Sequence, residues 1–206
     1  MPSPTLKLTY FDIKGRAESC RLALVLGGVP FEDDRIKHDT WKTMKASTPF
    51  GQVPVLTVDG TMVAQSLGIL RYCGVLGKLY PTEPLKALLV DQVVFTIDDI
   101  FATLAPTWTA PQEKKVQMRE ELIKTSWPTL FEGLEKVVKQ HGGNYCVGDS
   151  LTVADIVVYT AITSLKSGNL DGIPKTFIDS YKTLTAIYEK VHGLEKVTEW
   201  NAKHNK

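Results

Sequence analysis

The segment from Pro49 to Gly60, Pro-Phe-Gly-Gln-Val-Pro-Val-Leu-Thr-Val-Asp-Gly, constrains the fold more than any other part of this chain. Its apolar residues 53–58 indicate a strand, but Pro54 has no amide to donate and therefore belongs at a strand's start or edge. Asp59-Gly60 is typical of a tight turn between two short strands. We therefore expect a hairpin whose first strand begins beside a proline.

Gln65 and Ser66 stand where the second apolar run gives way to a helical pattern, residues 67–76. A serine at this place can cap the helix. The amides at a helix start also carry partial positive charge, which attracts a carboxylate. Because Pro54 would leave backbone groups of Val53 free, we interpret the whole strand–turn–strand–helix segment as a holder for a short peptide.

The rest of the chain divides at residues 78–84, where two prolines indicate a linker. Before it, a strand, a helix and a second strand at residues 6–11, 20–26 and 31–36 predict a right-handed βαβ unit with parallel strands. After it, helical patterns predominate, at residues 85–104, 113–140, 176–191 and 195–203, with a kink expected at Trp127-Pro128. We predict an α/β domain over residues 1–79 and an all-helical domain over residues 85–206.

Thr152 and Asp155 have capping-box spacing before an apolar run. The carboxylate can reach back to the open amides of the helix start, so Asp155 is interpreted as a helix-start determinant and not as a catalyst.

Composition excludes several classes of function. Lys and Arg number 24 against 23 Asp and Glu, and this near-balance argues against nucleic acid or an anionic membrane as the main partner. No apolar run reaches membrane-spanning length and the first residues lack a signal-peptide core, so we expect a cytoplasmic protein. The three cysteines, Cys20, Cys73 and Cys146, form neither a disulfide framework nor a metal-type pair, and buried thiols are favoured.

A wider set of residues carries a family resemblance. It comprises residues 8–18 (Leu-Thr-Tyr-Phe-Asp-Ile-Lys-Gly-Arg-Ala-Glu), Trp41, Lys45, the Pro-Phe-Gly-Gln-Val-Pro-Val-Leu stretch, Gln65-Ser66 and residues 150–155. In this order they resemble the cytosolic glutathione transferases over nearly the full chain, and the start looks most like the sigma class. The resemblance implies a thioredoxin-like N-terminal domain, an all-helical C-terminal domain and a homodimer.

The resemblance also implies that Tyr10 is the catalytic residue. A free thiol has a pKa of about 8.5, so little of it is thiolate at neutral pH. A phenol hydroxyl that donates a hydrogen bond to the sulfur stabilises the anion and lowers that pKa. Tyrosine remains protonated near neutrality and can keep donating. Without the surrounding pattern, Tyr10 reads equally well as an ordinary aromatic at a strand end.

The remaining site residues are implied by the same resemblance. Glutathione would be bound by Tyr10, Phe11, Arg16, Trp41, Lys45, Gly51, Gln52, Val53, Pro54, Gln65, Ser66 and Asp99. Gln65 and Ser66 would hold the γ-glutamyl end, Trp41 and Lys45 the glycine carboxylate, and Val53, before a cis Pro54, the cysteinyl backbone. Asp99 would reach across the dimer toward the γ-glutamyl amine.

A hydrophobic electrophile would lie against Phe11, Ile13, Leu104 and Trp108, an apolar and aromatic set. Glutathione would serve as co-substrate without a prosthetic group. No metal site is expected, because Phe95 occupies the place where some related isomerases carry an additional acid.

The expected reaction is attack of the glutathione thiolate on such an electrophile, giving a thioether. Residues 11–15 contain no cysteine, which disfavours disulfide exchange. Three alternatives remain open: a glutathione-dependent prostaglandin-H2 D-isomerase, a lipid peroxidase, and a non-catalytic ligand-binding or structural protein such as the lens S-crystallins.

Overall fold

The computed structural model describes residues 4–204, and these divide into two compact units. The first unit holds residues 4–80 and 194–204, and the second holds Pro81–Gly193. The elements of each unit are described separately below.

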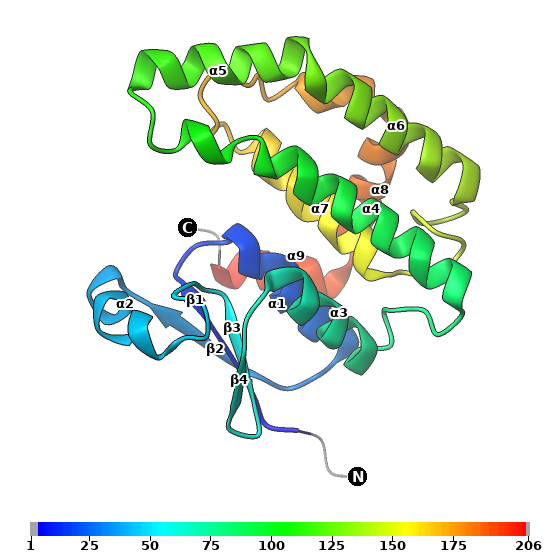
Figure 1. The fold of residues 1–206 in the computed structure, drawn as a ribbon. Coiled ribbons are helices and arrows are strands. Elements are labelled where there is room, and N and C mark those ends of the chain that lie inside the picture. Colours follow the sequence, from blue (N-terminus) through cyan, green and yellow to red (C-terminus); the bar gives the residue numbers. More distant parts are fainter. Residues whose placement is uncertain (1–3, 205–206) are drawn as a thin grey trace. The chain divides into compact units, whose positions relative to one another are not determined.

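A four-stranded mixed sheet forms the centre of the first unit (Figure 1). Its strands are β1 (Leu6–Phe11), β2 (Glu32–Ile36), β3 (Val55–Val58) and β4 (Thr61–Val63), in the order β2-β1-β3-β4. β1 and β2 run parallel, whereas β3 is antiparallel to both β1 and β4. The expected parallel βαβ unit and the hairpin turning at Asp59-Gly60 are therefore confirmed.

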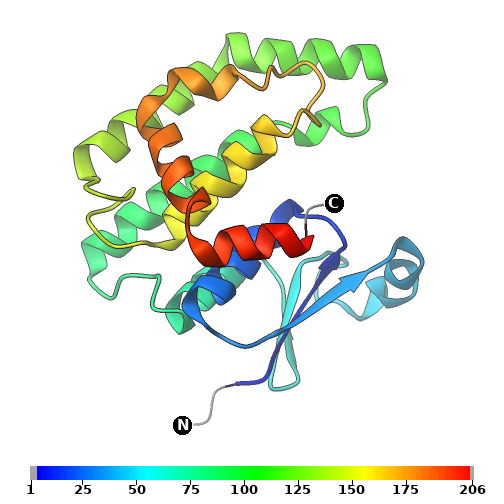
Figure 2. The same ribbon diagram turned by 180° about the vertical axis from the view of Figure 1, so that it is seen from behind.

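Helices flank this sheet. They are η1 (Gly15–Ala17), α1 (Glu18–Gly27), α2 (His38–Met44), η2 (Lys45–Ser47), α3 (Ser66–Leu76) and α9 (Glu195–His204). α1 contacts both α3 and α9, and Figure 2 shows α9 in red beside α1. The side chains of Leu6, Leu8, Leu22 and Leu70 are all nearly inaccessible to solvent, so they form part of the core between sheet and helices.

The last helix, α9, packs with the first unit, although the sequence placed it in a domain spanning residues 85–206. The indole Nε1 of Trp200 donates to a carboxylate oxygen of Glu18 at 2.9 Å, and Lys196 Nζ donates to the Leu26 carbonyl at 3.2 Å. These bonds join segments at opposite ends of the chain, a relationship that local pattern does not encode. The domain boundaries at 1–79 and 85–206 stay a prediction.

The regular elements of the second unit are helices. They are α4 (Pro84–Ala102), η3 (Ala105–Thr107), α5 (Gln112–Lys124), α6 (Ser126–His141), α7 (Val153–Lys166), η4 (Phe177–Ser180) and α8 (Lys182–His192). α7 contacts both α4 and α8 and is buried along most of its length, so it is the central helix of this unit (Figure 1). The predicted thioredoxin-like N-terminal domain followed by an all-helical one is confirmed.

Two predicted helices are divided in the structure. The pattern over residues 113–140 is broken at Thr125, between α5 and α6, instead of kinking at Trp127-Pro128. Pro128 lies in the first turn of α6, where backbone amides have no partner within the helix, so the proline is tolerated there. Residues 176–191 likewise form η4 and then α8, separated at Tyr181.

The predicted capping box at the start of α7 is confirmed. The fully buried Asp155 accepts hydrogen bonds from the Thr152 amide at 2.7 Å and from the Cys146 amide at 2.6 Å. Burial raises the pKa of this carboxyl, and these hydrogen bonds oppose the rise. Asp155 therefore joins the preceding loop to the start of the central helix.

Candidate functional site

Tyr10 lies near the end of β1 with only 8% of its surface exposed. The backbone amide of Arg16, in η1, donates to the Tyr10 hydroxyl oxygen at 3.4 Å. A phenol oxygen that accepts a hydrogen bond still has its own proton to donate. The loop between β1 and α1 therefore orients Tyr10 without consuming its donor.

Gly15 allows this loop to pass over the tyrosine. Its φ angle is +45°, and a β-carbon built there would stand 2.7 Å from the Tyr10 hydroxyl oxygen. Both the positive φ and the close approach favour glycine, because any side chain would collide with the ring. Arg16, the next residue, is exposed at the surface.

Arg21 contacts the backbone of the same loop. The sequence did not identify this residue as part of the site. Its side chain is fully buried and pairs with Glu18 at 3.2 Å and with Asp33 at 2.8 Å. Its Nη1 also donates to the Ile13 carbonyl at 2.7 Å, and its guanidinium carbon lies 5.8 Å from the centre of the Tyr10 ring. A buried arginine with several carbonyl acceptors fixes backbone geometry, which local sequence pattern does not reveal.

The ends of β1 and β2 bring Phe11 and the α2 segment together. Phe11 is in register with Ile36, the last residue of β2, and α2 follows that strand directly. The Phe11 ring centre lies 6.0 Å from that of Trp41 and 5.0 Å from that of His38. Two residues expected at the glutathione site, Phe11 and Trp41, are thus in one aromatic cluster.

The start of β3 lies at the same end of the sheet. In the antiparallel register Thr9 pairs with Val55, so the chain at Val53-Pro54 runs alongside the end of β1. The Val53-Pro54 bond is cis, as the family resemblance implied. Val53 lies just before β3, which begins at Val55, so it is not part of the paired strand.

Gln65 and Ser66 follow β4 and also reach this end, because Val63 pairs with Leu56. The structure corrects one detail: Gln65 occupies the N-cap position and Ser66 is the first helical residue, so the serine does not cap α3. The N-cap Gln65 has φ +78° and no side-chain capping bond. Outlying backbone angles of this kind are common at ligand-binding positions.

Lys45 and Gly51 lie close together after α2. Gly51 has φ +62°, and a β-carbon placed there would be 3.5 Å from Lys45 Cε. The Lys45 and Gln52 side chains are exposed, whereas Pro54 is buried. The segments that hold Tyr10, Val53 and Gln65 meet at one end of the sheet, and Lys45 and Gly51 lie in the connection that follows α2.

The second unit holds the other predicted site residues. Asp99 is an exposed residue of α4. Trp108, which follows η3, has 56% of its surface exposed, whereas Leu104 is only 1% exposed and packs in the core. Of the predicted electrophile-binding residues in this unit, Trp108 is the one presented to solvent.

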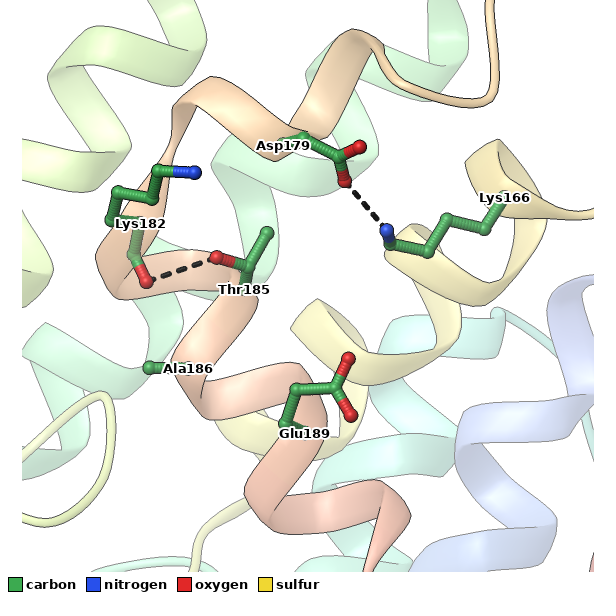
Figure 3. Close-up of a pocket in the computed structure, with 6 residues that line it drawn as sticks. All are labelled: Lys166, Asp179, Lys182, Thr185, Ala186 and Glu189. Carbon is green, nitrogen blue, oxygen red and sulfur yellow. Dashed lines mark hydrogen bonds and ion pairs between the residues drawn. The ribbon is translucent and has the colours of Figure 1, made fainter.

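Among residues 4–204, hollows of different size lie in the two units. The larger, about 440 Å³, is in the second unit, where Lys166 and Asp179 form an ion pair of 2.6 Å (Figure 3). Its lining is mostly charged or polar, from Lys166, Asp179, Lys182, Thr185, Ala186 and Glu189, and includes no predicted site residue. The smaller, about 240 Å³, is in the first unit and includes Ile13 and Lys14, directly after β1.

Other site types have little support in the described chain. Among residues 4–204, no group of three or more His, Cys, Asp or Glu side chains is placed to hold a metal ion. Within the same residues, no helix combines the length and apolarity needed to cross a bilayer. Cys20 is fully buried, and contact with Cys73 together with burial raises its pKa well above the usual value, so it is not a reactive thiol.

Comparison with known proteins agrees with this geometry. The family profile described as "Glutathione S-transferase, N-terminal domain" matches residues 6–74, and "Glutathione S-transferase, C-terminal domain" matches residues 98–204. Glutathione S-transferase 1 of Ascaris suum is 34% identical over 207 residues, covering 98% of both chains. Hematopoietic prostaglandin D synthase of Gallus gallus is also 34% identical, over 203 residues and 98% of each chain. Among solved structures, the Fasciola hepatica sigma class GST superposes with a TM-score of 0.86 at 25% identity, covering 98% of both chains.

Proposed function

Because the chain belongs to the glutathione S-transferase family, we propose that Tyr10 activates glutathione for attack on hydrophobic electrophiles. The protein is a transferase, and glutathione is its co-substrate. The observation that carries the residue-level proposal is the hydrogen bond from the Arg16 amide to the Tyr10 hydroxyl oxygen, at 3.4 Å. It leaves the phenol proton available for a bound sulfur.

The mechanism begins when the glutathione thiol approaches Tyr10. The phenol donates a hydrogen bond to the sulfur, and the thiolate is favoured because its charge is then partly neutralised. The Arg16 amide polarises the phenol by donating to its oxygen, which makes its O–H a better donor. The thiol proton passes to solvent, and the thiolate then forms a carbon–sulfur bond to the electrophile. In a substitution the leaving group departs with its bonding electron pair, and in an addition the electrophile takes up a proton, giving the thioether.

Binding of glutathione would use the strand-end residues. Val53, beside Pro54, would pair its backbone with the cysteinyl segment, and the open start of α3 at Gln65 and Ser66 would take the γ-glutamyl carboxylate. Trp41 and Lys45, with Gly51 and Gln52 beside them, would hold the glycine end. Phe11 and Arg16 would flank the sulfur, and Asp99 would contribute to a partner copy's site.

We propose Phe11 and Ile13 in the first unit, and Trp108 in the second, as residues that contact the electrophile. Ile13 is 57% exposed and Trp108 56% exposed, so both offer apolar surface to a ligand. Leu104 would support this site from the core and not contact the electrophile, since it is 1% exposed.

We assign the protein to the sigma class, as a cytoplasmic homodimer. The class follows from residues 8–18 and is supported by similarity to the Fasciola hepatica enzyme. Each unit presents large exposed apolar side chains that would suit a dimer contact: Phe50 and Val75 in the first, Leu85 and Leu88 in the second.

A second candidate activity is conversion of prostaglandin H2 to its D isomer. It is favoured by the 34% identity to the Gallus gallus prostaglandin D synthase, which equals that to the Ascaris suum transferase. The conjugation and isomerisation reactions would both use the Tyr10-bound thiolate. Lipid peroxide reduction would also use this thiolate, whereas a non-catalytic structural protein would not need the thiolate.

The test combines retention on immobilised glutathione with turnover of a chloronitro aromatic, prostaglandin H2 and a lipid hydroperoxide. We expect retention and conjugation, with conjugation but not retention dependent on Tyr10. Tyr10→Phe should keep glutathione affinity and lose turnover, while the matched control Tyr145→Phe, in the second unit, keeps both. Retention without turnover of any of the three substrates would favour the structural alternative.

A further inference from the structure

Arg119, in α5, is a buried cation beneath an exposed aromatic ring. Its side chain is only 1% exposed, yet its guanidinium carbon lies 4.8 Å from the centre of the Trp108 ring. Trp108 itself has 56% of its surface exposed. One face of the indole therefore rests on the arginine, and much of the rest of the ring is accessible to a ligand.

The arginine is held in place by neutral oxygens. Its Nε donates to Thr107 Oγ1 at 3.0 Å, and its Nη1 donates to the Asp171 carbonyl oxygen at 3.4 Å. Thr107 Oγ1 in turn donates to the Leu104 carbonyl at 2.8 Å. The guanidinium thus connects α5 to η3, directly before Trp108, and to the turn at Asp171.

That turn is closely packed against α5. Gly172 has φ +86°, and a β-carbon there would approach the Val116 carbonyl oxygen to 2.7 Å. The Asp171 carbonyl that Arg119 uses is therefore in a backbone segment with little room to shift. Both anchors of the guanidinium are fixed by their own surroundings.

Burying a cation is costly, and the two oxygens that accept hydrogen bonds from Arg119 carry no charge. Burial lowers the pKa of Arg119, and the charge of Asp171 offsets this effect only in part. The cation–π attraction to Trp108 is one compensating interaction, and it is stronger when the cation is shielded from water. An apolar side chain would fill the same space at a lower free-energy cost, so the charge of Arg119 indicates a role at the Trp108 ring.

We propose that Arg119 is a positioning residue that fixes the Trp108 ring and thereby sets which electrophiles the enzyme accepts. The proposal rests on the proposed function, which places Trp108 in the electrophile site. A ring held by a fixed guanidinium presents a rigid flat wall, which favours planar substrates over bulky or flexible ones. Glutathione binding, assigned to other residues, would be independent of it.

The test compares Arg119→Met with wild type and with Lys114→Met, which removes an exposed lysine from the same helix. Arg119→Met should raise the KM for a planar chloronitro aromatic by on the order of fivefold, with the KM for glutathione unchanged. The preference for planar over flexible electrophiles should fall. Lys114→Met should match wild type in all three measurements.

A readout independent of turnover is acrylamide quenching of Trp108 fluorescence, isolated by subtracting the signal of Trp108→Phe. Arg119→Met should increase quenching, since the ring loses its support. If the wild-type protein shows no turnover but quenching still increases in Arg119→Met, the proposed function fails and the positioning of Trp108 by Arg119 stands. If quenching and electrophile KM both stay at wild-type values in folded Arg119→Met, the inference is overturned.

A double variant separates a role through the ring from general loosening of the helices. In a Trp108→Ala background, Arg119→Met should have no further effect on electrophile KM; a further rise of the same size would contradict action through Trp108. Should Arg119→Met fail to fold, Arg119→Lys replaces it in every arm. The lysine keeps the charge but lacks the planar fork, so increased quenching is expected and unchanged quenching would overturn the proposal.

Discussion

Gly15 has φ +45°, and a β-carbon on it would stand 2.7 Å from the hydroxyl oxygen of Tyr10. The loop that supplies the Arg16 amide to Tyr10 therefore depends on the absence of a side chain at Gly15. The orientation of the Tyr10 hydroxyl is thus coupled to the presence of glycine at position 15. It follows that the orientation of Tyr10 can be disturbed without altering Tyr10 itself.

Gly15→Ala should lower kcat/KM strongly and destabilise the fold by about 1–3 kcal/mol, because it adds backbone strain and a collision with the tyrosine. Steady-state kinetics and urea unfolding would measure the two effects. The matched control is Gly133→Ala, in α6, where a β-carbon would meet nothing within 4 Å. That change should stabilise the protein by about 0.5–1 kcal/mol and leave activity unchanged. Wild-type activity in Gly15→Ala would refute the dependence of Tyr10 on this glycine.

Arg21→Met should cost about 3–5 kcal/mol of unfolding free energy, because Glu18 and Asp33 lose a buried partner. The Ile13 carbonyl also loses its hydrogen bond, at 2.7 Å in the wild type, so the loop beside Tyr10 should loosen. Urea unfolding measures the first effect, and hydrogen exchange of the loop amides the second. Lys42→Met serves as the control, since its ion pair with Asp39 is exposed and should contribute little. Equal stability losses in the two variants would show that Arg21 is not a structural anchor.

Glu135 should make stability depend on pH in the acid range. Burial alone would raise the pKa of this carboxyl, but hydrogen bonds from the Thr183 and Leu184 amides and from Lys139 outweigh it, and the pKa is lowered from 4.5. A lowered folded-state pKa means that the stabilisation is present above the unfolded-state value and is lost as pH falls through the folded-state value. Stability should therefore decline below about pH 4.5, and Glu135→Gln should flatten that part of the curve. If the urea midpoint of Glu135→Gln falls with decreasing pH as steeply as that of the wild type, this assignment is contradicted.

The three cysteines should not react with a thiol reagent in the folded protein. Cys20, Cys73 and Cys146 all have 0% exposure, and burial contributes to raising the pKa of Cys20 and of Cys146. Little thiolate therefore forms, and the reagent has no access to it. Labelling with an aromatic disulfide should report no reactive thiol in native protein and three in denaturant. Rapid labelling of native protein would show that one of these sites opens, and that a protein thiol could take part in redox chemistry.

The hairpin and the helix after it could be predicted because their signals are local. Proline at position 54, the Asp59-Gly60 turn and the apolar pattern of residues 67–76 each act over a few residues. The same holds for the capping box, where Thr152 and Asp155 are only three residues apart. In such cases side-chain chemistry and backbone conformation are directly coupled.

Features fixed by distant contacts could not be predicted in this way. Arg21 is a charged residue in an apolar helix, and only its pairing with Asp33, in β2, explains its burial. α9 lies with the first unit through Trp200 and Glu18, which are 182 residues apart. The break at Thr125 was also missed, since the more conspicuous Pro128 lies where a proline is tolerated. Each case depends on tertiary structure that has no local sequence signature.

The most direct test of the account is the ionisation of glutathione bound to the protein, followed by the ultraviolet absorbance of the thiolate as pH is varied. If Tyr10 donates to the sulfur, the thiol pKa in the wild-type complex should fall from about 8.5 to about 7. In Tyr10→Phe it should return to the value of free glutathione while binding persists. A bound thiol that titrates like free glutathione in the wild-type protein would contradict the account.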